Sequence, residues 1–267
     1  MNVIDILKET NRKMFLNETF EDFEKKEICN TLLYVKSDEY TVSRFHKGVR
    51  APDDGRMLYP QFFIPPYNDG KKLRLVTGQL PKTQLLSSNH YELEILRILA
   101  LWDNSNPIVK HMLNETLKRL DTTCFAHFCS TGECVGAGIT VLRLLSVLSP
   151  KDEKWICEIL NPLIKQYNGG HNGMAATNNN VPVFYLYSVL PDIANDACLT
   201  LVEQRKNWII HMLTRGNITG PAIQDTYNVM LLYILKNALA MLPEYAFMKS
   251  REVYISDKDN RCYCDIE

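Results

Sequence analysis

Prolines end a series of strongly apolar segments in the later two thirds of the chain, and this repeat constrains the fold more than any other feature. The segments HYELEILRILALWDNSNP, CVGAGITVLRLLSVLSP, VPVFYLYSVLP and DTYNVMLLYILKNALAMLP end at Pro107, Pro150, Pro191 and Pro243. These prolines lie 43, 41 and 52 residues apart. Because proline suits the first turn of a helix and cannot continue a preceding one, each unit predicts an apolar helix, a tight turn and a second helix.

The predicted second helices have a different pattern from the first. Residues 106–120 and 149–167 place apolar and charged side chains at helical spacing, which gives each segment one apolar and one solvated face. The first helices are apolar nearly all round, as expected of buried elements. Inner apolar helices covered by outer amphipathic helices are typical of stacked helical hairpins.

This contrast between inner and outer helices resembles that of the α/α toroids, the architecture of terpenoid cyclases, protein prenyltransferases and six-hairpin glycosidases. An open superhelix of the HEAT type is the alternative. The chain contains neither an aspartate-rich cyclase motif nor a Gln–Trp repeat, so the resemblance assigns no catalytic residue. We therefore predict an all-α fold of repeated hairpins of about 41–52 residues, arranged as an α/α toroid.

The first third of the chain differs from the repeat. One or two helices are predicted near the N-terminus, from residues 2–15 and 20–35, and residues 56–78 resemble two extended segments around an Asn-Asp-Gly turn. Prolines within the extended segments favour an edge or irregular arm. We expect residues 1–86 to pack as N-terminal helices and an arm on a hairpin body formed by residues 87–267, in one compact domain overall.

Composition excludes several classes of protein. The 267 residues carry a formal net charge of −1, which gives no basic excess for nucleic acid or anionic membranes. The longest strongly apolar run, residues 229–235, is far shorter than a membrane span, and the N-terminus lacks the apolar core of a signal peptide. A cytoplasmic location is expected, with most of the eight cysteines reduced.

In a toroid, the amino-terminal ends of the inner helices meet at one mouth. Four polar segments would come together there, residues 87–94, 130–138, 169–185 and 219–228. Carboxylates and a histidine at such a mouth suit acid–base chemistry, and helix N-termini favour an anionic ligand. The predicted catalytic residues are His90, Glu92, Glu133 and Asp225.

A structural role is the alternative for each carboxylate. Asn89 and Glu92 have the spacing of a capping box, and Glu133 and Asp225 fall where acidic residues favour the first turn of a helix.

Ligand-binding residues are predicted from the same loops. A glycine- and asparagine-rich loop near residues 168–180 has the composition of loops that border binding sites, although a plain surface connector would look similar. A basic stretch at residues 45–56 would suit a phosphate or carboxylate if the arm lies over the mouth. The candidates are Arg50, His171, Asn178, Asn179, Asn180, Tyr185 and Tyr227.

A cluster of cysteines raises the question of a metal. Cys124, His127, Cys129 and Cys134 are ligands that zinc accepts, but their spacing lacks the paired knuckles of structural zinc sites. A redox pair of Cys129 and Cys134 is a second possibility, and buried thiols are favoured over both. No cofactor is predicted.

Two function classes follow. The first, narrowly favoured, is an enzyme that uses acid–base chemistry on a small or elongated organic substrate at the toroid mouth. The second is a non-catalytic helical-repeat module that binds a peptide or protein.

Overall fold

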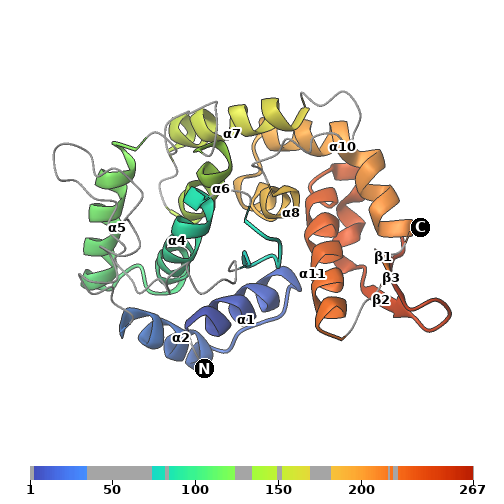
Figure 1. Cartoon of the computed structure of the whole chain (residues 1–267), viewed down its shortest axis with the longest axis horizontal. Coiled ribbons are helices and arrows are strands. Elements are labelled where there is room, and N and C mark those ends of the chain that lie inside the picture. The colour runs from blue at the N-terminus through green and yellow to red at the C-terminus, as the bar shows by residue number, and fades with distance from the viewer. Residues whose placement is uncertain are drawn as a thin grey trace.

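The protein is mostly helical, as the sequence predicts. The computed structural model describes residues 3–34, 74–81, 84–123, 134–148, 152–168, 182–215, 217–218 and 222–266. The helices in these ranges are α1 (Val3–Phe15), α2 (Asp22–Tyr34), α4 (Gln84–Trp102), α5 (Pro107–Leu120), α6 (Cys134–Leu145), α7 (Glu153–Asn168), α8 (Val183–Tyr187), α9 (Leu190–Ile193), α10 (Asp196–Arg215), α11 (Ala222–Leu239) and the 3₁₀ helix η1 (Pro243–Ser250) (Figure 1). None of the described helices is long and apolar enough to cross a membrane.

Helices α4 and α6 lie at the centre and pack directly against each other. Every residue from Asn89 to Ala100 and from Gly136 to Ser146 is buried. Helix α5, by contrast, buries Val109 but exposes Ile108, Lys110 and Lys118. The predicted distinction between buried first helices and amphipathic second helices is confirmed for these units.

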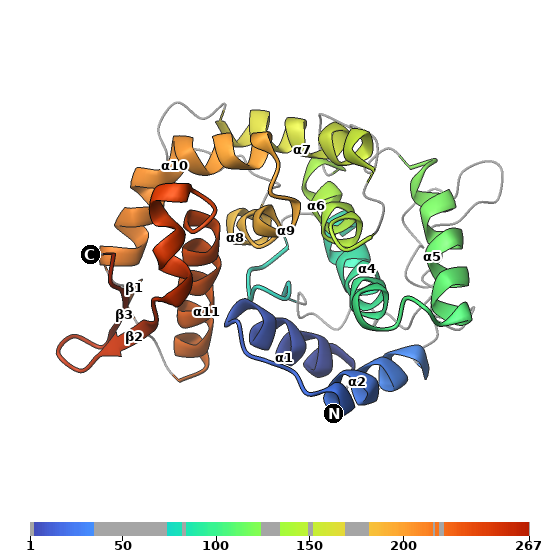
Figure 2. The ribbon, with the colours of Figure 1, turned by 180° about the vertical axis from the view of Figure 1, so that it is seen from behind.

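The amphipathic helices lie at the periphery. Helix α5 packs on α4, α7 packs on α6, and α10 packs on α11. Helix α1 contacts both α4 and α11, and α11 in turn contacts α8. Figures 1 and 2 show α5, α7 and α10 around the outside of these elements from opposite sides.

The turn before α5 shows how the repeat is built locally. Pro107 occupies the first turn of α5, where its missing N–H is not needed. The side chain of Asn106 caps the helix by accepting a 2.9 Å hydrogen bond from the Ile108 amide.

The third and fourth units depart from the predicted pattern. Residues 181–191 do not form one long helix. Helix α8 ends at Tyr187, and α9 extends only from Leu190 to Ile193. Ala194, which follows α9, takes φ 51°. After Pro243 the chain forms η1 rather than a full second α-helix.

A small sheet at the C-terminal end was not predicted. Strands β1 (Asn217–Ile218), β2 (Val253–Ser256) and β3 (Arg261–Cys264) form an antiparallel sheet in the order β1-β3-β2. Asn260 takes φ 57° in the β2–β3 turn, which asparagine tolerates. Alternate residues of β3, Cys262 and Cys264, are buried on one face of the strand.

At the N-terminus the predicted helical region is confirmed and consists of two helices, α1 and α2. Most of the predicted hairpin at residues 56–78 lies outside the described residues. Its last part is described, and Leu75, Val76 and Thr77 are buried there. The Gln79 side chain accepts a 3.1 Å hydrogen bond from the Tyr185 amide, which joins this segment to α8.

Candidate functional site

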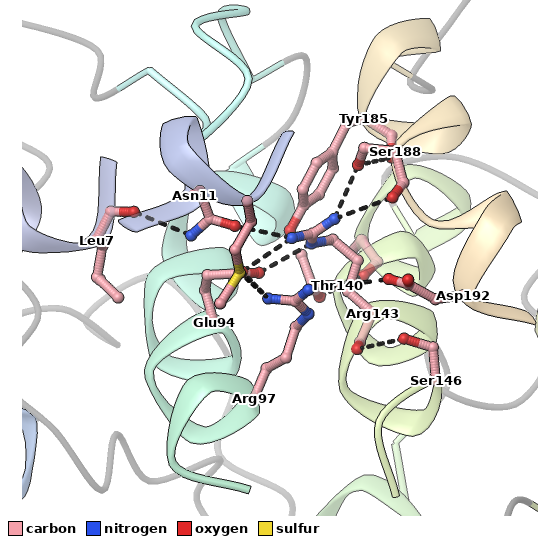
Figure 3. Close-up of polar contacts among 12 residues, drawn as sticks. Leu7, Asn11, Glu94, Arg97, Thr140, Arg143, Ser146, Tyr185, Ser188 and Asp192 are labelled. Atoms are coloured by element: carbon pink, nitrogen blue, oxygen red, sulfur yellow. Dashed lines mark hydrogen bonds and ion pairs between the residues drawn. The ribbon is translucent and has the colours of Figure 1, made fainter. Parts of the chain in front are cut away.

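A group of buried polar side chains, here called the Glu94 cluster, joins four helical segments at the centre of the molecule (Figure 3). Its members are Asn11 on α1, Glu94 and Arg97 on α4, Arg143 on α6, and Ser188 directly after α8. All five are buried. Buried charges are costly unless they are paired, so the arrangement of their partners decides what this cluster can do.

Arg143 is held on nearly every side. Its Nε and Nη2 donate to the two carboxylate oxygens of Glu94, both at 2.9 Å, in a bidentate pair. Nη2 also donates to Asn11 Oδ1 at 2.9 Å, and Nη1 donates to Ser188 Oγ at 2.8 Å. The rings of Phe15 and Tyr185 lie 5.3 and 5.4 Å from the guanidinium. Arg143 therefore fixes α1, α4, α6 and α8 relative to one another.

Glu94 and Arg143 each stabilise the charged form of the other. Burial alone would raise the pKa of Glu94, but the positive charges of Arg143 and Arg97 outweigh this effect and lower the pKa to about 2. Burial likewise disfavours the charged form of Arg143, yet the Glu94 carboxylate leaves its pKa raised. Glu94 and Arg143 are thus a permanently charged pair at neutral pH.

Arg97 is less completely paired than Arg143. Its Nη1 donates to Glu94 Oε1 at 3.0 Å and to the Met14 sulfur at 3.7 Å, and its Nη2 lies 3.8 Å from Asp192 Oδ2 on α9. Its Nε has no hydrogen-bond partner among the described residues. Burial, and then the like charge of Arg143, lower the pKa of Arg97.

A pocket of about 430 Å³ opens beside this guanidinium, and we call it the Arg97 pocket. It lies among α1, α4, the α8–α9 segment, α11 and η1. Its lining residues are Met14, Phe15, Asn17, Arg97, Tyr187, Ser188, Pro191, Asp192, Ile234, Asn237 and Lys249. Arg97 and Ser188 belong to both the Glu94 cluster and the pocket, so the buried network supports one wall of the pocket.

The end of α1 supplies another wall. Asn17 takes φ 58° after the helix, where the amides of Asn17 and Glu18 donate to the carbonyls of Met14 and Lys13 in a Schellman arrangement. The side-chain amide of Asn17 bonds that of Asn237 on α11, with Nδ2 to Oδ1 at 3.1 Å. Asn237 Nδ2 also donates to the Phe15 carbonyl at 3.2 Å.

Two of the predicted catalytic residues can be located. Glu92 and His90 are buried on α4, and His90 Nδ1 lies 3.2 Å from the Leu86 carbonyl. Burial raises the pKa of Glu92 well above its usual range, and Arg119 on α5 only partly opposes this. Glu92 Oε1 has no hydrogen-bond partner among the described residues. Glu133 lies outside the described residues, and so does the side chain of Asp225 in α11.

The predicted ligand-binding residues are mostly outside the described part of the chain. Arg50, His171, Asn178, Asn179 and Asn180, with the side chain of Tyr227, lie there. Tyr185 is fully buried against Arg143, and its hydroxyl has no described hydrogen-bond partner. Burial and the nearby Glu94 carboxylate raise the pKa of Tyr185.

The cysteines and histidine weighed as zinc ligands, but not favoured as such, fall in another part of the chain that the structure does not describe. Cys124, His127 and Cys129, with the side chain of Cys134, lie outside the described residues. Within the described ranges, no three His, Cys, Asp or Glu side chains are grouped so as to hold a metal ion.

The charged members of the Glu94 cluster are not among the residues predicted for the site. Arg143 is the only charged residue in the apolar stretch 134–148, and such a cation requires a buried carboxylate partner. Glu94 and Arg97 have the i, i+3 spacing of a pair on one face of a helix. These two signals together predict a buried ion-pair network between the first and second apolar helices.

Comparisons with family models, curated proteins and solved structures find no match to this chain.

Proposed function

We propose that the protein binds a small organic molecule in the Arg97 pocket, at the centre of a closed α/α toroid. Contacts of α1 with α4 and α11, of α11 with α8, and of α4 with α6 support the closure, together with the Arg143–Ser188 hydrogen bond between α6 and α8. The amphipathic helices α5, α7 and α10 would form the outer layer.

The pocket itself is the observation that carries this proposal. Its volume of about 430 Å³ falls within the range typical of small-molecule sites. Its walls combine apolar side chains with a few fixed polar groups. The Glu94 cluster holds the helices that present these groups, and such support is what a binding site requires.

Fragment screening by NMR tests the proposal, with methyl groups of methionine and isoleucine labelled. Bound fragments should shift the methyl signals of Met14 and Ile234, which line the pocket. Met112 and Ile159 are buried elsewhere and serve as internal controls. Fragment hits that shift the control methyls and leave Met14 and Ile234 unchanged would overturn it.

Acid–base catalysis by Glu92 is a second candidate function. It is favoured by the burial of this carboxyl group, its raised pKa and the absence of a described partner for Oε1. A carboxyl group with a raised pKa holds its proton to higher pH, which suits a general acid.

A substrate panel of hydrolase and lyase reactions tests this role. The Glu92→Gln variant should lose about 100-fold or more of any activity found, because general acids commonly contribute that much. Glu92→Asp should retain part of the rate. An activity unchanged in Glu92→Gln would exclude Glu92 from the chemistry.

Peptide binding, the alternative from the sequence, has one supporting feature. A pocket of about 260 Å³ between α1 and α2 combines apolar Ile6, Phe20 and Ile28 with Glu24 and Glu27. Acidic residues around an apolar groove suit a basic amphipathic peptide. Fluorescence anisotropy with such a peptide and its acidic counterpart would test this, and equal binding of both would contradict it.

A further inference from the structure

We propose that the ligand of the Arg97 pocket is a small organic carboxylate with an apolar body. Its carboxylate would pair with Arg97, and its body would lie against Met14, Phe15 and Ile234. This inference rests on the proposed function and adds the chemical class of the ligand.

The first argument is the number of unused donors on Arg97. A guanidinium has five N–H groups, and it is planar in a way that matches a carboxylate. The described hydrogen bonds of Arg97 all use Nη1, Nη2 lies 3.8 Å from Asp192, and Nε has no described partner. The Arg97 side chain is only 7% exposed, so donors without acceptors are costly there.

Arg143 gives an internal comparison. Its Nε, Nη1 and Nη2 all donate to described oxygen atoms at 2.8–2.9 Å. Within one cluster, described protein groups therefore accept hydrogen bonds from all three nitrogens of Arg143. Arg97, which lines the pocket, keeps N–H donors without a described acceptor. An acceptor inside the pocket would remove this difference.

The second argument is the balance of charge. Arg97 and Arg143 share the single carboxylate of Glu94 at the centre. The nearest further carboxylate, Asp192, is 42% exposed and 3.8 Å from Arg97, which is longer than a hydrogen bond. Among the lining residues, two cations, Arg97 and Lys249, face the one carboxylate of Asp192. A ligand with one negative charge balances that excess.

The α1 and α11 residues that line the pocket do not form a typical phosphate site. Phosphate sites commonly use the free amides at helix N-termini. Helices α1 and α11 instead line the pocket with residues of their C-terminal halves or just beyond them. The apolar walls would receive the hydrocarbon part of the ligand, where its burial is favourable.

Matched sets of ligands test the charge requirement by isothermal titration calorimetry. Three bodies are used, phenyl, pentyl and indole, each as the propionate-type acid, the corresponding primary amide and the corresponding amine. At least one acid should bind at least tenfold more tightly than its amide, and no amine should bind comparably. An amide that matches its acid, or three acids that all fail to bind, would overturn the inference.

This experiment also separates the two proposals. If neutral amides bind and shift the methyl signals of Met14 and Ile234, the pocket is a ligand site but the carboxylate assignment is wrong. If no fragment of any charge shifts these signals, the proposed function fails as well.

Variants at the rim test the same point without removing a buried group. Asp192→Asn removes the competing negative charge and should tighten acid binding about fivefold, whereas Lys249→Gln should weaken it about threefold. Lys206→Gln is the control, because Lys206 pairs with Glu203 and Glu244 and does not line the pocket. Acid binding that is weakened or unchanged in Asp192→Asn would contradict the inference.

Discussion

Glu92 and Glu94 lie two residues apart on α4, and both are buried, yet their surroundings give them opposite properties. Glu94 accepts hydrogen bonds from two arginines, and its pKa is lowered to about 2. Glu92 has only the partial influence of Arg119, and its pKa is raised well above the usual range. Residues at this spacing face nearly opposite sides of a helix, so the two carboxyl groups of one buried helix meet different surroundings.

The comparison teaches that burial alone does not decide the state of an acid. Desolvation raises the pKa of both groups, and it is the largest influence in each case. The outcome differs because Arg143 and Arg97 donate hydrogen bonds to Glu94, whereas the charge of Arg119 only partly offsets the effect of burial on Glu92.

The largest effect is expected from Glu94→Gln. It leaves two buried guanidiniums without their carboxylate, which should lower the free energy of unfolding by about 3–5 kcal/mol. Glu92→Gln places a neutral group where burial disfavours the carboxylate, so this variant should not lower the free energy of unfolding at pH 7. Urea denaturation of both variants at pH 7 measures the contrast. Equal losses in the two variants would remove the distinction between the two carboxyl groups.

Lowering the pH should reduce the difference in stability between wild type and Glu94→Gln. The pKa of Glu94 is lower in the folded than in the unfolded chain, so its contribution is present above pH 4.5 and is lost as the pH falls toward 2. The stability difference between wild type and Glu94→Gln should therefore shrink by on the order of 3 kcal/mol over this range. Urea denaturation at pH 5, 4 and 3 follows the change. A constant difference would show that Glu94 is not the titrating group.

Raising the pH should lower the stability that Glu92 contributes, whereas for Glu94 it is lowering the pH that does so. The folded protein keeps a proton on Glu92 that the unfolded chain releases as the pH rises above about 4.5. Stability from this group is complete below that pH and declines above it, whereas Glu92→Gln lacks the decline. The variant should therefore gain stability relative to wild type between pH 4 and pH 8. The same denaturation series measures it, and parallel pH profiles would contradict the raised pKa.

The smallest effect is expected from Tyr185→Phe. The Tyr185 ring lies against Arg143, while its hydroxyl has no described hydrogen-bond partner. Removing the hydroxyl keeps the ring and should change the free energy of unfolding by less than about 0.5 kcal/mol. A loss above about 1.5 kcal/mol in thermal or urea unfolding would show that the hydroxyl has a strong partner.

The sequence predicted much of the helical framework. Proline punctuation and apolar periodicity located α4, α5, α6, α7 and α11, because these signals depend on neighbouring residues alone. The C-terminal strands were missed because their short segments follow a repeat that favours helix. Residues 181–191 were predicted as one helix, but α8 ends at Tyr187 and the separate short helix α9 begins at Leu190.

The candidate site was harder to predict. Glu92 was selected because of its place near a helix start, while Glu94, two residues further along and on nearly the opposite side of the helix, was not considered. Arg143 contacts Asn11 and Ser188, which lie 132 and 45 residues away in the chain. Contacts over such separations depend on how helices are arranged in space, and the periodicity of one segment does not contain this information. A lone arginine in an apolar helix indicates that a buried acidic partner exists, but it does not show which residue that partner is.

The Asn17–Asn237 contact has a consequence for the order of folding. It joins residues 220 positions apart, and Asn237 also bonds the carbonyl of Phe15. During synthesis, the first helix therefore emerges long before its neighbour α11 exists. The apolar face of α1 is covered only after α11 has been synthesised. Contacts between residues so far apart in the sequence make folding slow. We therefore expect nascent chains that stop before α11 to keep this surface uncovered and to depend on chaperones.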